Sequence, residues 1–159
     1  MKHLLFSIIC LCLFISCKKN TEQISTDIHA LEKYITLPKV PKKVKYQLIE
    51  TPIRAGGQDC TTGLSIYAVL EFSQEDFNSI VNMSTEKYTF PLQVTSESFK
   101  EWYPDLVKKK FIKKDNDFVM LSPPIFDGVI FSKKNTNAQP LFFTTENNEI
   151  FIIYKMCKN

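Results

Sequence analysis

LSIYAVLEF, residues 64–72, decides the fold of this chain of 159 residues. Only Ser65 and Glu71 interrupt its apolar character, and Ile66 and Val69 are β-branched residues of the kind that strands favour. Apolar residues on both faces are typical of a strand that lies inside a sheet rather than at its surface. The stretch therefore predicts a central strand.

Further strands are predicted on both sides of this stretch. In KVKYQLIE, residues 43–50, the apolar side chains of Val44, Tyr46 and Leu48 share one face, which gives a period of two. After the central strand, four more apolar stretches separated by turn residues predict strands at residues 117–122, 128–132, 141–145 and 149–156. The last two form a predicted hairpin, joined by residues 146–148.

Helices are predicted in the middle of the chain. Ser73-Gln74-Glu75-Asp76 resembles a capping box and begins a helix that ends near Met83. SESFKEWYPDLVKKK, residues 96–110, predicts a second helical piece, which Pro104 ends or kinks. The order of elements predicts an α+β fold with a mainly antiparallel sheet of about five to six strands and two helices packed on one face. Residues 44–159 are expected to form this single globular domain.

The N-terminus carries an apolar run from Leu4 to Ile15 that only Ser7 interrupts, with Lys2 before it. A helix of this length spans about 18 Å, which is short of the roughly 30 Å hydrocarbon core of a bilayer. A charged residue followed by a short apolar run is typical of a secretory signal peptide. Residues 1–16 are therefore predicted to be a signal peptide that is removed.

The end of this run, Phe14-Ile15-Ser16-Cys17, resembles the lipobox of bacterial lipoproteins. The resemblance covers residues 1–17 and implies cleavage before Cys17 and acylation of that cysteine, with the lipid bilayer as a partner. Lys18 and Lys19 would then lie beside anionic head groups. The resemblance also implies a place in the cell envelope, and Lys18 in the position after the cysteine favours the outer membrane, facing the periplasm.

A tether is predicted between the lipidated cysteine and the domain, over residues 17–43. Within it, residues 27–35 predict a short helix, with Ser25 or Thr26 as its N-cap. Pro38 and Pro41 follow, and they favour extended chain.

Charge and cysteine content limit the function further. Without residues 1–16 the chain has 143 residues and a net charge of +2, which is too balanced for a general nucleic-acid binder. Cys10 and Cys12 leave with the signal peptide, so Cys60 and Cys157 remain beside the lipidated Cys17. An even remainder in an exported domain predicts a Cys60–Cys157 disulfide, with two unrelated buried thiols as the alternative. The second and last strands are then expected to be antiparallel neighbours.

No catalytic residue, metal or cofactor is predicted. The mature chain has one histidine, His29, so neither a nucleophile–histidine pair nor a zinc site is expected. Residues 115–117, Asp-Asn-Asp, lack the remainder of a calcium loop and predict a turn. The alternative for an enzyme is a pair of carboxylates, for which Glu71, Glu75 and Asp76 are the sequence cluster.

Three features are candidates for binding. Trp102 and Tyr103 are residue types that dominate contacts when they are exposed, although packing of both onto the sheet is the favoured alternative. Arg54 lies in a loop with two glycines that allow close approach of a ligand. A run of five lysines fits an anionic partner or, alternatively, a solvated face: Lys108, Lys109, Lys110, Lys113 and Lys114.

These features favour a membrane-anchored, non-enzymatic binding domain that recognises a protein of the cell envelope. An immunity or inhibitor lipoprotein, or an accessory of assembly, fits that description. The first alternative is an envelope hydrolase that acts on glycan or peptide through carboxylates. The second alternative is a structural spacer without a specific ligand.

Overall fold

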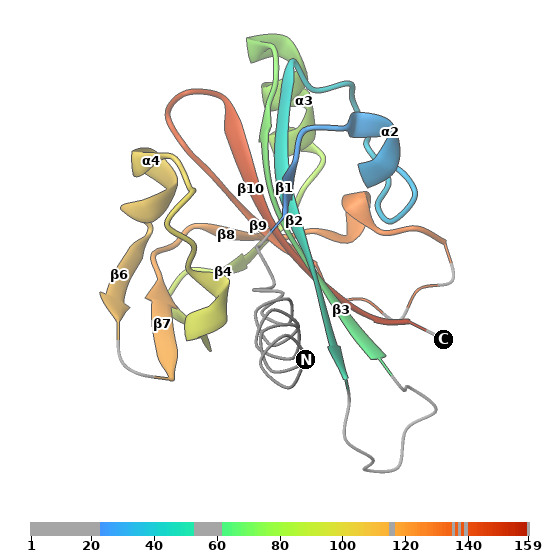
Figure 1. The fold of residues 1–159 in the computed structure, drawn as a ribbon. Helices are drawn as coiled ribbons and strands as arrows, with labels where there is room; N and C mark the ends of the chain where they lie inside the picture. The colour runs from blue at the N-terminus through green and yellow to red at the C-terminus, as the bar shows by residue number, and fades with distance from the viewer. Residues whose placement is uncertain are drawn as a thin grey trace, which may run out of the picture.

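A computed structural model describes residues 23–52, 62–114, 117–134 and 140–158, together with Thr136 and Ala138. These residues form two antiparallel sheets and five helical segments (Figure 1). The large sheet has the order β1 (Ile24–Ser25), β2 (Lys43–Pro52), β3 (Thr62–Glu71), β10 (Glu149–Lys158), β9 (Leu141–Thr144), β8 (Ile125–Asp127) and β4 (Glu86–Tyr88). The small sheet has the order β5 (Leu92–Thr95), β7 (Phe118–Leu121) and β6 (Phe111–Lys114). The helical segments are α2 (Ile28–Leu31), α3 (Gln74–Asn82), η1 (Ser96–Ser98), α4 (Asp105–Lys108) and η2 (Val129–Phe131).

The strand β3 lies in the interior of the large sheet, as the stretch at residues 64–72 predicts. It pairs along its full length with β2 on one side and with β10 on the other. Ala68 lies opposite Tyr46 in one ladder and opposite Ile152 in the other, and all three side chains are buried. The predicted hairpin of the last two strands is confirmed as β9 and β10.

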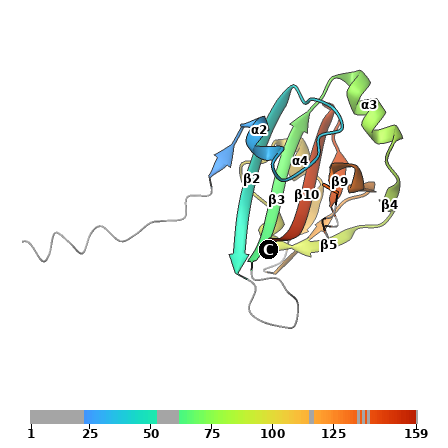
Figure 2. The same ribbon diagram turned by 90° about the vertical axis from the view of Figure 1, so that its right-hand side faces the viewer.

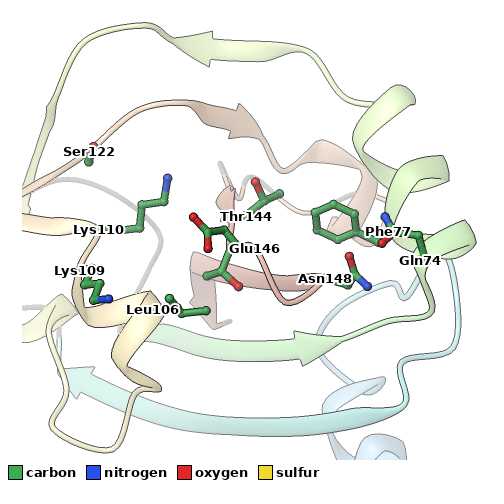
Figure 3. A pocket seen from close by; sticks show the side chains of 10 residues that line it. Gln74, Phe77, Leu106, Lys109, Lys110, Ser122, Thr144, Glu146 and Asn148 are labelled. Carbon is green, nitrogen blue, oxygen red and sulfur yellow. The ribbon is translucent and has the colours of Figure 1, made fainter.

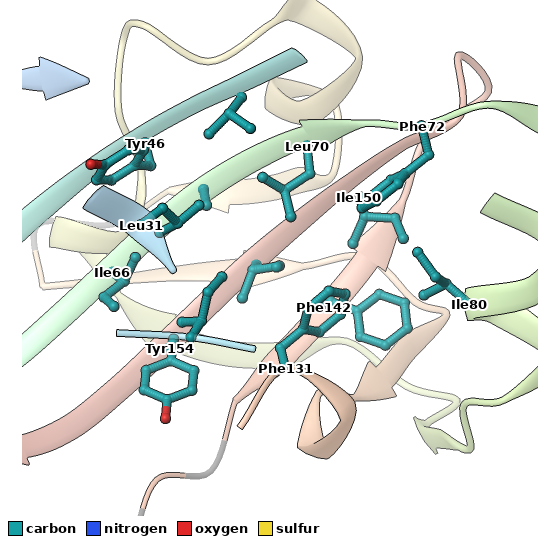
Figure 4. Close-up of a cluster of buried hydrophobic side chains, with 14 of the residues drawn as sticks. Leu31, Tyr46, Ile66, Leu70, Phe72, Ile80, Phe131, Phe142, Ile150 and Tyr154 are labelled. Atoms are coloured by element: carbon teal, nitrogen blue, oxygen red, sulfur yellow. The ribbon is translucent and has the colours of Figure 1, made fainter. Parts of the chain in front are cut away.

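One face of the large sheet is covered by α2, α3 and η2. Leu31 of α2, Ile80 of α3 and Phe131 of η2 pack in one buried cluster with side chains from β2, β3, β9 and β10 (Figure 4). Ile66 of β3 and Tyr154 of β10 belong to this cluster and are fully buried.

The opposite face is covered by the small sheet and α4. Val107 of α4 and Leu121 of β7 pack there against Tyr67, Phe143 and Phe151 of the large sheet. Figure 2 shows α2 in front of the large sheet and α4 behind it. The architecture therefore has three layers, with a buried cluster on each side of the large sheet.

The α+β class and the mainly antiparallel sheet are confirmed, whereas two helices on one face are not. Three α-helices occur in the described residues, and Ile80 of α3 and Val107 of α4 belong to opposite clusters. The physical reason is that β3 and β10 alternate large apolar residues on both faces, so both faces need cover. The described residues form ten strands, which is more than the five to six expected. Several of the additional strands have only three or four residues and are too short to be recognised from the sequence.

Two further local predictions are wrong. Residues 128–132 do not form a strand, because Val129–Phe131 is the 3-10 turn η2 and the strand β8 precedes it. Residues 96–110 do not form one helical piece either. Pro104, which lacks an N–H group, is the N-cap of the short α4, and the turn η1 lies before it.

The helix predicted within the tether packs as part of the folded unit. Its N-cap is Asp27, whose Oδ1 accepts hydrogen bonds from the backbone N–H groups of His29 and Ala30. Leu31 and Ile35 are buried against the large sheet. In addition, Ile24 of β1 lies opposite Gln47 of β2, so the folded unit extends to the N-terminal side of residue 44.

The predicted adjacency of the second and last strands is confirmed. β3 and β10 are antiparallel neighbours, and Cys157 lies opposite Gly63 at the end of their ladder. Cys60, three residues before Gly63, lies outside the described residues, so the disulfide between the two cysteines stays a prediction.

The losses of stability caused by substituting the two cysteines should be strongly non-additive, because either substitution removes the predicted bond. Cys157→Ser, Cys60→Ser and the double variant should each lose the same stability, up to about 4.7 kcal/mol in the chain-entropy model for a loop of about 100 residues. Urea unfolding followed by the fluorescence of the single tryptophan measures the loss. Additive losses, or a wild-type domain whose two thiols react with a labelling reagent before reduction, would contradict the bond.

Candidate binding cleft

An open cleft of about 620 Å³ lies between α3, the end of α4 and the turn between β9 and β10 (Figure 3). These three segments are far apart in the sequence, and Ser122, which follows β7, adds a fourth. Their lining residues are Gln74, Phe77, Leu106, Lys109, Lys110, Ser122, Thr144, Thr145, Glu146 and Asn148.

Local hydrogen bonds fix the wall formed by α3. Ser73 is the N-cap of this helix, as the capping box predicts, and its Oγ accepts a hydrogen bond of 3.1 Å from the N–H of Asp76. The same hydroxyl donates a hydrogen bond of 2.8 Å to Asp76 Oδ2. Because the helix begins at Gln74, that residue and Phe77 lie one turn apart on the side of the cleft.

The turn between β9 and β10 forms the opposite wall. The N–H of Thr145 donates a hydrogen bond to the Glu149 carbonyl at 3.0 Å, and the Thr145 hydroxyl donates one to Glu149 Oε2 at 3.0 Å. Asn148 has a φ of 58°, a left-handed conformation that asparagine tolerates better than most residues. The N–H of Phe72 donates to its carbonyl at 3.1 Å and ties the turn to the end of β3.

The third wall comes from the lysine run, which the structure divides into parts. Lys108 Nζ lies 4.0 Å from carboxylate oxygens of Glu101 and Asp105. Lys109, which is exposed, and Lys110, which is half-buried, line the cleft. The backbone of Lys113 and Lys114 belongs to β6, at one edge of the small sheet. Of the three candidate lysines whose side chains the structure describes, Lys109 and Lys110 therefore line this site and Lys108 does not.

The aromatic pair Trp102–Tyr103 packs on the domain. Tyr103 is 3 % exposed, and its hydroxyl donates a hydrogen bond of 2.8 Å to the Ser98 carbonyl. Trp102 is half-buried, and its indole N–H donates to Gln47 Oε1 at 3.3 Å. Lys45 Nζ lies 5.2 Å from the centre of the indole ring and donates to the Trp102 carbonyl. Packing is thus confirmed for Tyr103, which a partner cannot reach.

The remaining candidates give no further site. Arg54, Cys60 and Cys17 lie outside the described residues. His29 is exposed on α2, 3.2 Å from Glu32 Oε2, as expected of a solvated residue. No group of three or more possible metal ligands occurs in the described part of the chain.

Sequence reasoning missed most of the cleft. The lysine run points to one wall, but no periodic pattern or motif links Phe77 to Thr144 or Glu146. Their proximity results from the pairing of β3 with β10, which brings the start of α3 to the β9–β10 turn.

A buried phenol beside the aromatic pair makes stability depend on pH. Tyr67 is 1 % exposed, and Lys100 Nζ lies 5.9 Å from the centre of its ring. Burial raises the pKa of the Tyr67 hydroxyl above its usual value, and this outweighs hydrogen bonds to Ser98 and Ser65 that lower it. The folded protein therefore holds this proton at a pH at which the unfolded chain releases it.

Tyr67→Phe should remove this dependence. The wild-type protein should lose stability relative to the variant as the pH rises above about 10, by at most about 1.4 kcal/mol per pH unit. Below that pH the difference in the free energy of unfolding between the two proteins should be constant, because the phenol of the wild type is protonated in both the folded and the unfolded state. Urea unfolding between pH 8 and 11 measures it, and parallel curves throughout this range would contradict the prediction.

Comparisons with protein-family models, with curated proteins and with solved structures each give no match to the chain. In the residues that the structure describes, no helix has the length and apolar character needed to cross a bilayer.

Proposed function

We propose that this chain is a lipid-anchored lipoprotein of the bacterial cell envelope whose domain binds a protein partner through the cleft. The carrying observation is a pair of adjacent lysines, Lys109 and Lys110, on the wall of an open cleft, with no ion pair to any described residue. The lipobox-like Phe14-Ile15-Ser16-Cys17 supports the anchor. Insertion of the acylated Cys17 into the outer membrane would hold the domain on the periplasmic side.

The carboxylates of the described residues favour binding over hydrolysis. A glycosidase that works through carboxylates needs two of them, about 5–9.5 Å apart, on either side of the bond. Among the described lining residues, Glu146 is the only carboxylate. Glu71 pairs with Lys43 at 2.8 Å, and Asp76 is occupied by the Ser73 cap and lies 3.6 Å from Lys39. We therefore propose a non-enzymatic domain of the immunity, inhibitor or assembly type.

Affinity capture tests the partner. The tagged full-length lipoprotein, extracted in detergent, serves as bait, with Lys109→Glu/Lys110→Glu as the test variant. Lys133→Glu/Lys134→Glu is the matched control, because it reverses two adjacent lysines that do not line the cleft. The wild-type bait should recover one envelope protein near one to one. The amount recovered by the test variant should be lower by at least about tenfold.

Other outcomes of the capture separate the alternatives. Equal recovery by the test variant would remove the cleft from the proposal. Recovery of cell-wall fragments would favour the hydrolase, and recovery of nothing by any bait would favour the spacer.

The anchor has its own test. Cys17→Ala should abolish incorporation of labelled palmitate, because the thiol that receives the diacylglycerol is gone, and it should leave the signal peptide uncleaved. The matched control Cys12→Ala changes a cysteine inside the apolar run and should label like the wild type. Continued labelling of Cys17→Ala would contradict the lipoprotein assignment.

A further inference from the structure

Charges of opposite sign face each other in the cleft. Lys109 is the C-cap of α4, Lys110 follows it, and Glu146 belongs to the β9–β10 turn. Figure 3 shows the side chains of Lys110 and Glu146 pointing toward one another across the opening. No ion pair joins either of them to a described residue, so their charges are available to a ligand.

The sum of these charges selects the kind of ligand. Two lysines and one glutamate give the cleft a net charge of +1. A polyanion such as a nucleic acid or an anionic lipid surface would place negative charge against Glu146, at an energetic cost. A ligand that combines a carboxylate with a nearby N–H donor or cation satisfies both walls.

The rest of the lining fits a polypeptide. The side chains of Thr144 and Asn148 make no side-chain hydrogen bond to a described residue, and both groups can donate and accept. Phe77 and Leu106 are half-buried and offer apolar surface from two different walls, those of α3 and α4. A volume of about 620 Å³ lies in the range of pockets that hold small ligands, so a short segment fits and a folded domain does not.

From this arrangement we infer that the cleft binds a short acidic peptide segment. A carboxylate of the segment lies between Lys109 and Lys110, an N–H donor or cation faces Glu146, and an apolar side chain contacts Phe77 and Leu106. The inference rests on the proposed function, because it names the part of the protein partner that enters the cleft.

Labelled peptides test this chemistry directly. The full-length lipoprotein in detergent is titrated into a pool of fluorescein-labelled hexapeptides that each contain one glutamate, one leucine and one lysine. A matched pool carries glutamine in place of glutamate. Fluorescence anisotropy should detect binding of the acidic pool at least about tenfold tighter than that of the amide pool.

Three variants place the binding in the cleft. Lys109→Gln/Lys110→Gln should remove the preference for the acidic pool, whereas Lys133→Gln/Lys134→Gln should keep it. Glu146→Gln should bind acidic peptides that lack lysine more tightly than the wild type does, because it removes the repulsion of the carboxylate. Thermal unfolding of each variant verifies that the fold persists.

The outcomes distinguish the two proposals. If neither pool binds while capture still recovers a protein that depends on Lys109 and Lys110, the peptide inference is wrong and the proposed function stands. If the acidic pool binds but capture recovers no protein, the proposed protein partner is wrong, whereas the inference that the cleft binds acidic peptides stands. Equal affinity for both pools, or displacement of the peptides by vesicles of phosphatidylglycerol, would overturn the inference in favour of a general anion surface.

Discussion

The structure depends on the burial of both faces of the ladder formed by β2, β3 and β10. Residues Ile66 to Leu70 in β3 and Ile150 to Tyr154 in β10 are buried without interruption, so no face of these strands is left for solvent. A sheet of this kind is stable only with a layer on each side. The helices α2 and α3 with η2 provide one layer, and the small sheet with α4 provides the other. The cleft lies where elements of these two layers meet the β9–β10 turn.

The strands of this ladder could be predicted from the sequence because each carries a long apolar or alternating pattern. The Ser73 cap and the β9–β10 hairpin were also readable, since each is fixed by residues close in sequence. Of the strands in the second covering layer, only β7 was readable, within the predicted strand at residues 117–122. The strands β5 and β6 have four residues each, and such lengths carry too little periodicity to separate a strand from a loop.

At the cleft, too, features set by neighbouring residues in the sequence could be predicted, whereas features set by tertiary contacts could not. Lysine enrichment at residues 108–110 was a local signal, and Lys109 and Lys110 do line the cleft. Nothing local distinguishes them from Lys108, which faces Glu101 and Asp105. Trp102 and Tyr103 are adjacent in sequence, yet only Tyr103 is fully buried, because it packs against Phe151 of β10. Burial at such positions is a property of the tertiary contacts.

The pairing of β1 with β2 limits how far the domain of the proposed lipoprotein could move from its anchor. It fixes Ile24 to the edge of the large sheet, so six residues, 18–23, separate the folded unit from Cys17. Fully extended, the seven residue steps from Cys17 to Ile24 span about 24 Å. In the lipid-anchored form that we propose, the domain would be confined to a thin shell above the bilayer and would encounter partners by lateral diffusion. Confinement to this shell would raise the effective concentration toward membrane-bound partners, so a modest affinity in the cleft would suffice for stable recognition there.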